Sequence, residues 1–248
     1  MTGRTALITG GGTGLGRQFS LTLAEAGATV VLAARRREPL EEVADAIQHR
    51  GGTAHCLVFD VADSSQVEAA LSSIAHLGTI DVLVNNAGTA AGSSLLEMGE
   101  ETWDQVLNVN LKGAWLVARS SAKRMIAANI GGSIINVSSV LGSAVQKGTA
   151  NYPAAKAALT HLTRSMAVEW ARFGIRANAL APGYFATDLS AAYLESPRGQ
   201  DMLERIPQRR LGSPEELSGA LLLLASRAAN YMTGSVVTVD GGLSLPLI

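Results

Sequence analysis

Short apolar segments alternate with longer amphipathic segments along the whole chain, and this alternation restricts the possible folds most strongly. The apolar segments are rich in β-branched residues and lie at residues 5–9, 29–33, 54–59, 82–85, 133–137, 176–181 and 236–239. Because they are continuously apolar, they are typical of strands covered on both faces. The sequence therefore predicts an α/β fold, a Rossmann-type doubly wound parallel sheet of about seven strands with helices on both faces.

The intervening segments have the periodicity of amphipathic helices, at residues 38–50, 64–76, 101–128, 152–172 and 214–226. No linker or low-complexity stretch interrupts the series, which indicates a single domain over residues 1–248. Residues 184–210 are the least regular region, and an insertion at the carboxyl end of a parallel sheet lies beside the ligand crevice. We therefore expect residues 184–210 to form a substrate loop within this domain.

Charge and composition disfavour several classes of partner. The 20 basic and 21 acidic residues nearly cancel, so nothing favours nucleic acid or an anionic membrane. No apolar stretch approaches the ~20 residues that span a bilayer, and the N-terminal residues run directly into a strand-like segment. A single cysteine, Cys56, precludes an internal disulfide, and the four histidines are too scattered to indicate a metal site. We expect a soluble, cytoplasmic protein.

A glycine-rich segment directly follows the first predicted strand and leads into a helical pattern. It reads Thr9-Gly10-Gly11-Gly12-Thr13-Gly14-Leu15-Gly16. Glycines allow a tight turn and a close approach of backbone N–H groups to an anion, and the helix N-terminus adds about half a positive charge. This position in a βαβ unit predicts a dinucleotide-binding loop, although a purely steric turn is the alternative. The spacing is TGxxxGxG and not GxGxxG, because Leu15 stands where the third glycine would be.

Tyr152 and Lys156 are four residues apart in a helical segment and therefore share one face. A free phenol ionises near pH ~10, and a nearby ammonium and a positively charged nicotinamide ring would lower its pKa. Such a phenol can exchange a proton with a carbonyl or alcohol oxygen. Pro153 is tolerated only in a first helical turn, which predicts Tyr152 at the helix start. The alternative is a surface pair that decorates a helix.

Five motifs together resemble the short-chain dehydrogenase/reductase family, in order and over the whole chain. They are TGxxxGxG, Asn85-Asn86-Ala87-Gly88, Tyr152-Pro153-Ala154-Ala155-Lys156, Pro182-Gly183 with Thr187, and Asp240-Gly241-Gly242. The resemblance implies an NAD(P)(H)-dependent oxidoreductase that transfers a hydride between nicotinamide and a carbonyl or secondary alcohol. Members that act on 3-oxoacyl-acyl-carrier thioesters, on ketones, and on sugar acids or polyols are similar to about the same degree. The substrate therefore stays open, as do its stereochemistry and an acyl-carrier partner.

The resemblance also implies roles for individual residues of the catalytic centre. The family's catalytic serine precedes the tyrosine by thirteen positions, which selects Ser139 to stabilise the developing alkoxide. Ser138 is the second candidate, and either serine could simply cap a turn. Asn110 is implied to mark a helix distortion that holds a water between Lys156 and solvent; a solvent-facing polar position is the alternative. The predicted catalytic set is Asn110, Ser139, Tyr152 and Lys156.

Cofactor choice is predicted at the end of the second strand. NAD-preferring relatives carry an aspartate where this chain has Ala34, whereas NADP-preferring relatives carry an arginine at the position of Arg35. A guanidinium suits a 2′-phosphate, so NADP(H) is favoured and NAD(H) stays open. Against this, Thr13 stands where many NADP-preferring members have a second basic residue, and residues 35–37 could be a solvated patch.

Other cofactor contacts are carried over from the family position by position. Asp60, with Val61 beside it, is implied to accept from the adenine amine, although a simple turn aspartate is the alternative. Small residues after the fourth strand allow the backbone to approach the ribose, and residues after the sixth strand are implied to meet the carboxamide. The full predicted set is Gly10, Gly12, Thr13, Gly14, Leu15, Gly16, Arg35, Asp60, Val61, Asn86, Ala87, Gly88, Tyr152, Lys156, Pro182, Gly183 and Thr187.

Two helical segments, 101–128 and 152–172, are apolar on more than one side, which predicts burial against other copies of the chain. Family resemblance implies a homotetramer. Two other functions compete with the oxidoreductase. A non-catalytic dinucleotide-sensing scaffold would fit the same fold, and an NAD-dependent epimerase or dehydratase would fit the Tyr–Lys pair. The short chain, with no C-terminal sugar-nucleotide domain, argues against the epimerase.

Overall fold

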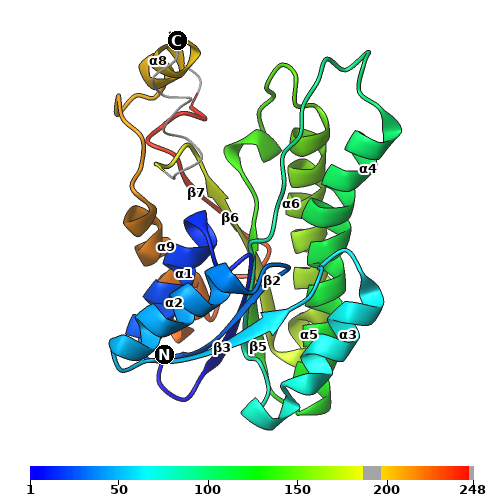
Figure 1. Ribbon diagram of the computed structural model, residues 1–248, viewed down its shortest axis with the longest axis vertical. Coiled ribbons are helices and arrows are strands. Elements are labelled where there is room, and N and C mark those ends of the chain that lie inside the picture. Colours follow the sequence, from blue (N-terminus) through cyan, green and yellow to red (C-terminus); the bar gives the residue numbers. More distant parts are fainter. Residues whose placement is uncertain (187–196, 246–248) are drawn as a thin grey trace.

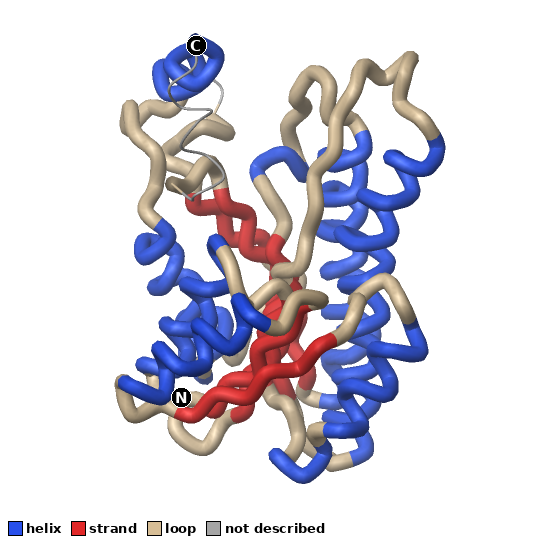
Figure 2. The backbone as a smooth tube through the Cα atoms, in the orientation of Figure 1, coloured by secondary structure: helices blue, strands red, loops and turns tan. Residues whose placement is uncertain are grey.

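The computed structural model describes residues 1–186 and 197–245, and their strands form one sheet (Figures 1 and 2). The strand order is β3-β2-β1-β4-β5-β6-β7, and every adjacent pair is parallel. The strands are β1 (Thr5–Thr9), β2 (Thr29–Ala34), β3 (Thr53–Val58), β4 (Val82–Asn85), β5 (Gly132–Val137), β6 (Ile175–Pro182) and β7 (Val236–Val239). The predicted seven-stranded, doubly wound fold is confirmed.

Helices cover both faces of this sheet. On one face lie α1 (Gly14–Glu25), α2 (Glu38–His49) and α9 (Ser218–Ala225), and on the other α3 (Ser64–Ser73), α4 (Glu100–Leu107), α5 (Ala114–Ala127) and α6 (Asn151–Trp170) (Figure 1). A further helix, α8 (Pro197–Arg205), follows β6. Within the described ranges, no helix is both long and apolar enough to cross a membrane.

The apolar segments are continuous because each strand packs against both helical layers. In β1, Ala6 and Ile8 belong to the core beneath α1 and α2, whereas Leu7 belongs to the core beneath α3 and α5. All three are fully buried. Alternate side chains of one strand therefore enter two cores, so no position of β1 can be polar and solvent-facing.

The predicted helical segment over residues 101–128 is interrupted around Asn110, where the family resemblance implied a distortion. A π-helical segment, Asn108–Gly113, separates α4 from α5. Asn110 donates a hydrogen bond to the Val106 carbonyl at 2.9 Å and a second to the Thr89 carbonyl at 2.7 Å, outside the helix. At the end of this segment the backbone packs closely against the turn that follows β3. A Cβ on Gly113 would lie 2.8 Å from the Val61 side chain.

Local sequence signals position the helix starts near the site. The Asp63 carboxylate caps α3 by accepting hydrogen bonds from the backbone of Ser65 and Gln66. In α6, Pro153 lies in the first turn, as predicted, so the helix begins one residue before Tyr152. The expected substrate loop, 184–210, lies partly outside the described residues.

Candidate active site

Polar and glycine-rich segments gather at the carboxyl edge of the sheet, where parallel strands all end. The glycine loop follows β1, residues 86–88 follow β4, Ser138 and Ser139 follow β5, and Gly183 follows β6. The N-terminus of α6 reaches the same edge, because the loop from β5 carries the chain to Asn151. This edge is where parallel α/β sheets bind ligands.

The glycine loop is shaped for close approach of a ligand's anionic group. Gly10 and Gly14 have positive φ angles of 67° and 51°. A Cβ on Gly16 would lie 2.0 Å from the Gly10 carbonyl oxygen, so no other residue fits there. Asn86 fixes the loop by donating from Nδ2 to the Thr9 carbonyl at 3.0 Å.

The N-terminus of α1 is left free to bind an anion. Thr13, at the N-cap, makes no side-chain capping hydrogen bond, and the first turn carries no acidic residue. Backbone N–H groups of a first helical turn have no partner within the helix and need an external acceptor. A dinucleotide pyrophosphate fits this requirement, so the residues present suit the cofactor that the motif predicts. Leu15, by contrast, packs its side chain into the core beneath α1.

Arg35 and Asp60 face each other beyond the ends of β2 and β3. One Arg35 nitrogen lies 3.9 Å from Asp60 Oδ2, and the Arg35 side chain is 72% exposed. Asp60 Oδ1 accepts a hydrogen bond from the Ala62 backbone at 2.9 Å. Asp60 therefore also stabilises a turn, which was the alternative to adenine binding. Ala34 ends β2 with no carboxylate. The end of β2 therefore offers a guanidinium and not an acceptor for a ribose hydroxyl.

Tyr152 lies in the first turn of α6, and its phenol is close enough to the Ser139 hydroxyl for that group to affect its pKa. Burial raises the pKa of Tyr152, the Ser139 hydroxyl opposes that rise, and the nearby Tyr184 adds to it. The lowering expected with a bound nicotinamide ring stays a prediction, but the pKa shift of this chain by itself is opposite to the lowering expected from Lys156. The physical reason is desolvation, which favours the neutral phenol.

Lys156 is buried and turned toward the sheet. Its Nζ donates a hydrogen bond to the Val137 carbonyl at 2.8 Å and lies 5.5 Å from the centre of the Tyr152 ring. Burial lowers the pKa of Lys156 to about 8. Lys156 and Tyr152 thus share one helical face, as predicted, and this buried ammonium is poised to lose its proton near neutral pH.

Asn110 carries an unused acceptor into the same region. Its side chain is 1% exposed, and Oδ1 has no hydrogen-bond partner among the residues that the structure describes. A Cβ on Gly88 would lie 2.7 Å from this oxygen, so Oδ1 points at the segment after β4. The helix is distorted here, as the resemblance implied, while the water relay stays a prediction. A buried acceptor without a partner calls for an external donor.

The adjacent serines after β5 have different partners. Ser138 is buried, and its hydroxyl donates to the Lys156 carbonyl at 3.1 Å and lies 2.8 Å from the Thr160 hydroxyl. Ser139 lies near the Tyr152 phenol and accepts a hydrogen bond from the Leu141 backbone at 3.1 Å. The turn-capping alternative is therefore real for Ser139, but of the two serines only Ser139 affects the pKa of the phenol.

Sequence reasoning missed Asn151, which fixes the start of α6. Asn151 is fully buried; its Oδ1 accepts from the Tyr152 backbone at 2.9 Å, and its Nδ2 donates to the Thr102 carbonyl of α4 at 3.2 Å. It ties the helix that carries Tyr152 to the helix that runs into Asn110. An asparagine immediately before the predicted helix 152–172 was the available signal.

The remaining predicted cofactor residues are placed mainly by backbone packing. Asn86 and Ala87 each donate a backbone hydrogen bond to the Thr9 hydroxyl at 3.0 Å, next to the glycine loop. Pro182 ends β6, and a Cβ on Gly183 would lie 2.7 Å from the Asp240 Cα after β7. Thr187 lies outside the described residues.

Comparison with known proteins agrees with this geometry. Residues 10–244 match the family described as enoyl-(acyl carrier protein) reductase. The chain is 40% identical to 3-oxoacyl-[acyl-carrier-protein] reductase FabG of Thermotoga maritima, over 97% of this chain and 98% of that protein. It also resembles the crystal structure of a short-chain type dehydrogenase/reductase from Mycobacterium marinum, with a TM-score of 0.94, 39% identity, and coverage of 99% of this chain and 97% of that one.

A crystal structure of gluconate 5-dehydrogenase from Burkholderia cenocepacia, in complex with NADP and tartrate, is similar over 100% of this chain and 97% of that chain. Its TM-score is 0.95 and its identity is 40%. Sequence and structure therefore agree over nearly the full length of each protein. The chain belongs to the short-chain dehydrogenase/reductase family, whose members are NAD(P)(H)-dependent oxidoreductases.

Proposed function

We propose that the protein transfers a hydride between NADP(H) and a carbonyl or secondary alcohol, with Tyr152 as the acid and base. The observation that carries this proposal is the convergence of three side chains: Lys156 Nζ lies 5.5 Å from the Tyr152 ring centre, and the Ser139 hydroxyl is close enough to the phenol to lower its pKa. The bound dinucleotide supplies or accepts the hydride. A single domain over residues 1–248 both binds the dinucleotide and carries out catalysis, with residues 184–210 as its substrate loop.

In the reductive direction, the hydroxyls of Ser139 and Tyr152 donate hydrogen bonds to the carbonyl oxygen of the substrate. Negative charge develops on this oxygen as the carbon is reduced, and Tyr152 then gives it a proton. Burial raises the pKa of Tyr152, so the phenol holds the proton that reduction consumes. Oxidation of an alcohol runs the same transfer backwards and needs the phenolate.

Lys156 and Asn110 return the proton to Tyr152. A Lys156 pKa of about 8 allows this ammonium to release and regain a proton close to physiological pH. The unpartnered Asn110 Oδ1 accepts a hydrogen bond from a water that links Lys156 to solvent. Asn110, Ser139, Tyr152 and Lys156 thus form the proposed catalytic set.

NADP(H) is the proposed cofactor, with NAD(H) as the alternative. The Arg35 side chain is exposed, and its ion-pair contact within the described residues is a long one, 3.9 Å from Asp60, so its donors are available to a 2′-phosphate. The Burkholderia relative was crystallised with NADP. Comparing kcat/KM for NADPH and NADH with one substrate tests this proposal, and a clear NADH advantage would overturn it.

The substrate belongs to one of two classes suggested by relatives, a 3-oxoacyl thioester or a sugar acid. Absorbance at the nicotinamide band should be followed with β-keto esters, diketones, polyols and sugar acids. Net oxidation or reduction of the cofactor supports the oxidoreductase. Isomerisation or dehydration without net cofactor turnover would favour the epimerase or dehydratase, and binding without any chemistry would favour the sensor.

We further propose that the protein acts in the cytoplasm as a homotetramer. Trp115 on α5 is 37% exposed and Val168 on α6 is 81% exposed, on helices whose other sides face the core. Apolar side chains in these places favour burial by another copy of the chain. Light scattering at micromolar concentration tests the assembly, and a monomer would contradict it.

A further inference from the structure

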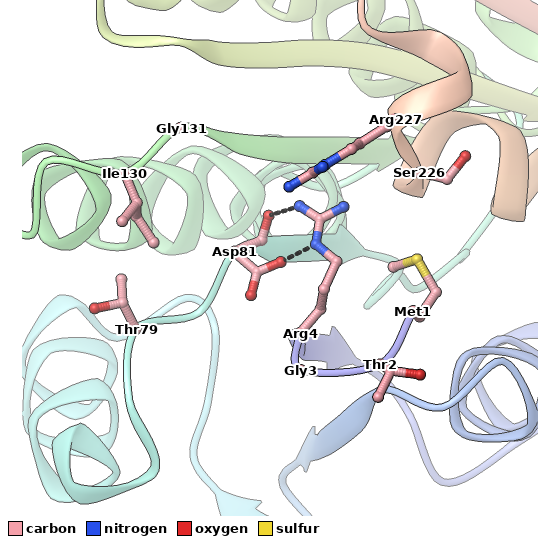
Figure 3. Close-up of a pocket in the computed structure, with 10 residues that line it drawn as sticks. All are labelled: Met1, Thr2, Gly3, Arg4, Thr79, Asp81, Ile130, Gly131, Ser226 and Arg227. Atoms are coloured by element: carbon pink, nitrogen blue, oxygen red, sulfur yellow. Dashed lines mark hydrogen bonds and ion pairs between the residues drawn. The ribbon is translucent and has the colours of Figure 1, made fainter.

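Two adjoining cavities lie at the amino edge of the sheet, away from Tyr152 and the glycine loop. One has a volume of about 820 Å³ and is lined by Arg4, Asp81 and Arg227, among others (Figure 3). The second, of about 250 Å³, shares Arg4 and Arg227 and adds Arg176. The larger volume lies within the ~300–1,000 Å³ of small-molecule sites.

Positive charge exceeds negative charge around these cavities. Among the described residues that line them, Asp81 carries the only carboxylate, against three guanidinium groups. Both Asp81 oxygens are already engaged. One pairs with the Arg4 guanidinium, and the other accepts a hydrogen bond from the Thr5 backbone at 2.9 Å. Asp81 therefore neutralises Arg4 and leaves two cations without a counter-charge.

Arg176, on β6, is held in place without a carboxylate partner in the described structure. It donates to the carbonyls of Leu224 at 3.0 Å and Ser226 at 3.1 Å. Burial lowers the pKa of Arg176, and the charge of Arg4 lowers it further. The two guanidiniums are thus close enough to repel each other, and carbonyl dipoles alone stabilise Arg176.

Arg227 completes the group from the loop after α9. Within the described part of the chain, its side chain makes no hydrogen bond or ion pair, and it extends toward the Arg4 guanidinium (Figure 3). Arg4 and Arg176 already donate to Asp81 and to backbone carbonyls, so they supply fixed positive charge, and Arg227 supplies the free N–H donors beside them. Guanidinium groups match the oxygens of a phosphate in geometry and charge.

We propose that this pocket, formed by Arg4, Arg176 and Arg227, binds the phosphate group of inorganic phosphate or of a small phosphomonoester. The anion supplies the negative charge that Asp81 does not, and Arg227 closes on it. Arg4, Gly132 and Arg176 lie at the starts of β1, β5 and β6, so the bound anion joins three strands and the loop after α9. It stabilises the folded chain and leaves the chemistry at the opposite edge unchanged.

The test compares Arg227→Gln with Arg164→Gln, a control that removes an exposed arginine of α6. The unfolding temperature, Tm, is measured for the wild type and both variants with inorganic phosphate, at an ionic strength held constant with sodium chloride. Phosphate that binds at the glycine loop raises Tm equally in all three proteins. A difference between them in the phosphate-induced rise in Tm therefore reports binding at the arginine pocket. We expect phosphate to raise Tm in the wild type and in Arg164→Gln, and most of this rise to vanish in Arg227→Gln.

Equal rises in all three proteins, or no rise in the wild type, would overturn the proposal. Arg227 is exposed, so both variants should fold and keep the wild-type kcat, which serves as the folding control. Glycerol 3-phosphate, in a parallel series, distinguishes the two sources. A larger Arg227-dependent rise with the ester identifies a phosphomonoester, and an equal or smaller rise identifies inorganic phosphate.

Discussion

The two edges of the same sheet differ in how far their polar groups are hydrogen-bonded. At the carboxyl edge, hydrogen-bonding capacity is left unused: the first turn of α1 has no side-chain cap, and Asn110 Oδ1 has no partner. At the amino edge, Arg4 and Arg176 are tied to backbone carbonyls and to Asp81. Unused capacity serves binding and catalysis, whereas the bonded charges of the amino edge hold strand ends together. At the amino edge, the Arg227 side chain is the exception: it makes no hydrogen bond or ion pair in the described part of the chain. This free guanidinium is why the amino edge also suggests a ligand site.

The largest expected effect comes from Tyr152→Phe, at the carboxyl edge. Loss of a positioned acid and base should lower kcat by about 10²–10⁴-fold, while the Kd of the dinucleotide stays near the wild-type value. Steady-state kinetics and a fluorescence titration of the cofactor measure the two effects. The control is Tyr231→Phe, a fully exposed tyrosine, which should change neither. Near-wild-type turnover by Tyr152→Phe would remove this residue from the mechanism.

The two neighbouring serines sharpen the comparison within a single turn. Ser139→Ala should lower kcat by about 10²-fold, since it removes a donor to the developing oxyanion. Ser138→Ala should leave kcat nearly unchanged and lower the free energy of unfolding by about 1 kcal/mol, because it removes the buried hydrogen bonds of this hydroxyl with the Lys156 carbonyl and the Thr160 hydroxyl. The Lys156 carbonyl keeps the Thr160 hydroxyl as a donor. Kinetics and urea unfolding of both variants separate the roles. The assignment is wrong if the two phenotypes are exchanged.

Lys156 connects the carboxyl edge to stability through pH. Its pKa is about 8 when folded and near 10.5 when unfolded, so between these values the unfolded chain binds the extra proton. The free energy of unfolding should therefore rise with pH from about 8 to about 10, by up to about 3 kcal/mol. Above pH ~10 the raised pKa of Tyr152 acts in the opposite direction.

Urea unfolding across this pH range should show that rise in the wild type and not in Lys156→Met. Methionine keeps an unbranched, buried side chain and removes only the titrating group. The same slope in both proteins would mean that Lys156 stays protonated throughout the range, and its role in proton return would then fail.

Cofactor choice should depend on a single guanidinium at the carboxyl edge. Arg35→Gln should reduce the NADPH over NADH preference in kcat/KM by about 10–100-fold, which corresponds to one charge-assisted hydrogen bond of about 1.5–3 kcal/mol. Arg36→Gln removes the neighbouring exposed arginine and should change the ratio little. If both variants lower NADPH use equally, residues 35–37 act as a diffuse positive patch.

The smallest effect, and one on stability alone, is expected from Asp81→Asn at the amino edge. The variant leaves Arg4 without a charged partner and should lower the free energy of unfolding by about 1–2 kcal/mol. Because Asp81 lies at the start of β4, kcat and KM should stay at wild-type values. A loss of activity without a loss of stability would break the division between the two edges.

Prediction from sequence succeeded where the signal is local. The segments 5–9, 82–85 and 236–239 match β1, β4 and β7 to the residue, and Asp63 caps α3 as its sequence indicates. It failed where distant groups compete for the same atoms. The pKa of Tyr152 is raised and not lowered, because burial outweighs the effect of its neighbours.

The sequence by itself determined the parallel sheet, the glycine loop and the pairing of Tyr152 with Lys156 on one face, because periodicity and helical spacing act between residues close in the chain. Tertiary structure alone decided that Ser138 bonds to the Lys156 carbonyl and the Thr160 hydroxyl, and that three arginines share the amino edge. Hydrogen-bond partners and desolvation are set by segments that fold together from far apart. These interactions leave no local pattern from which they could be read.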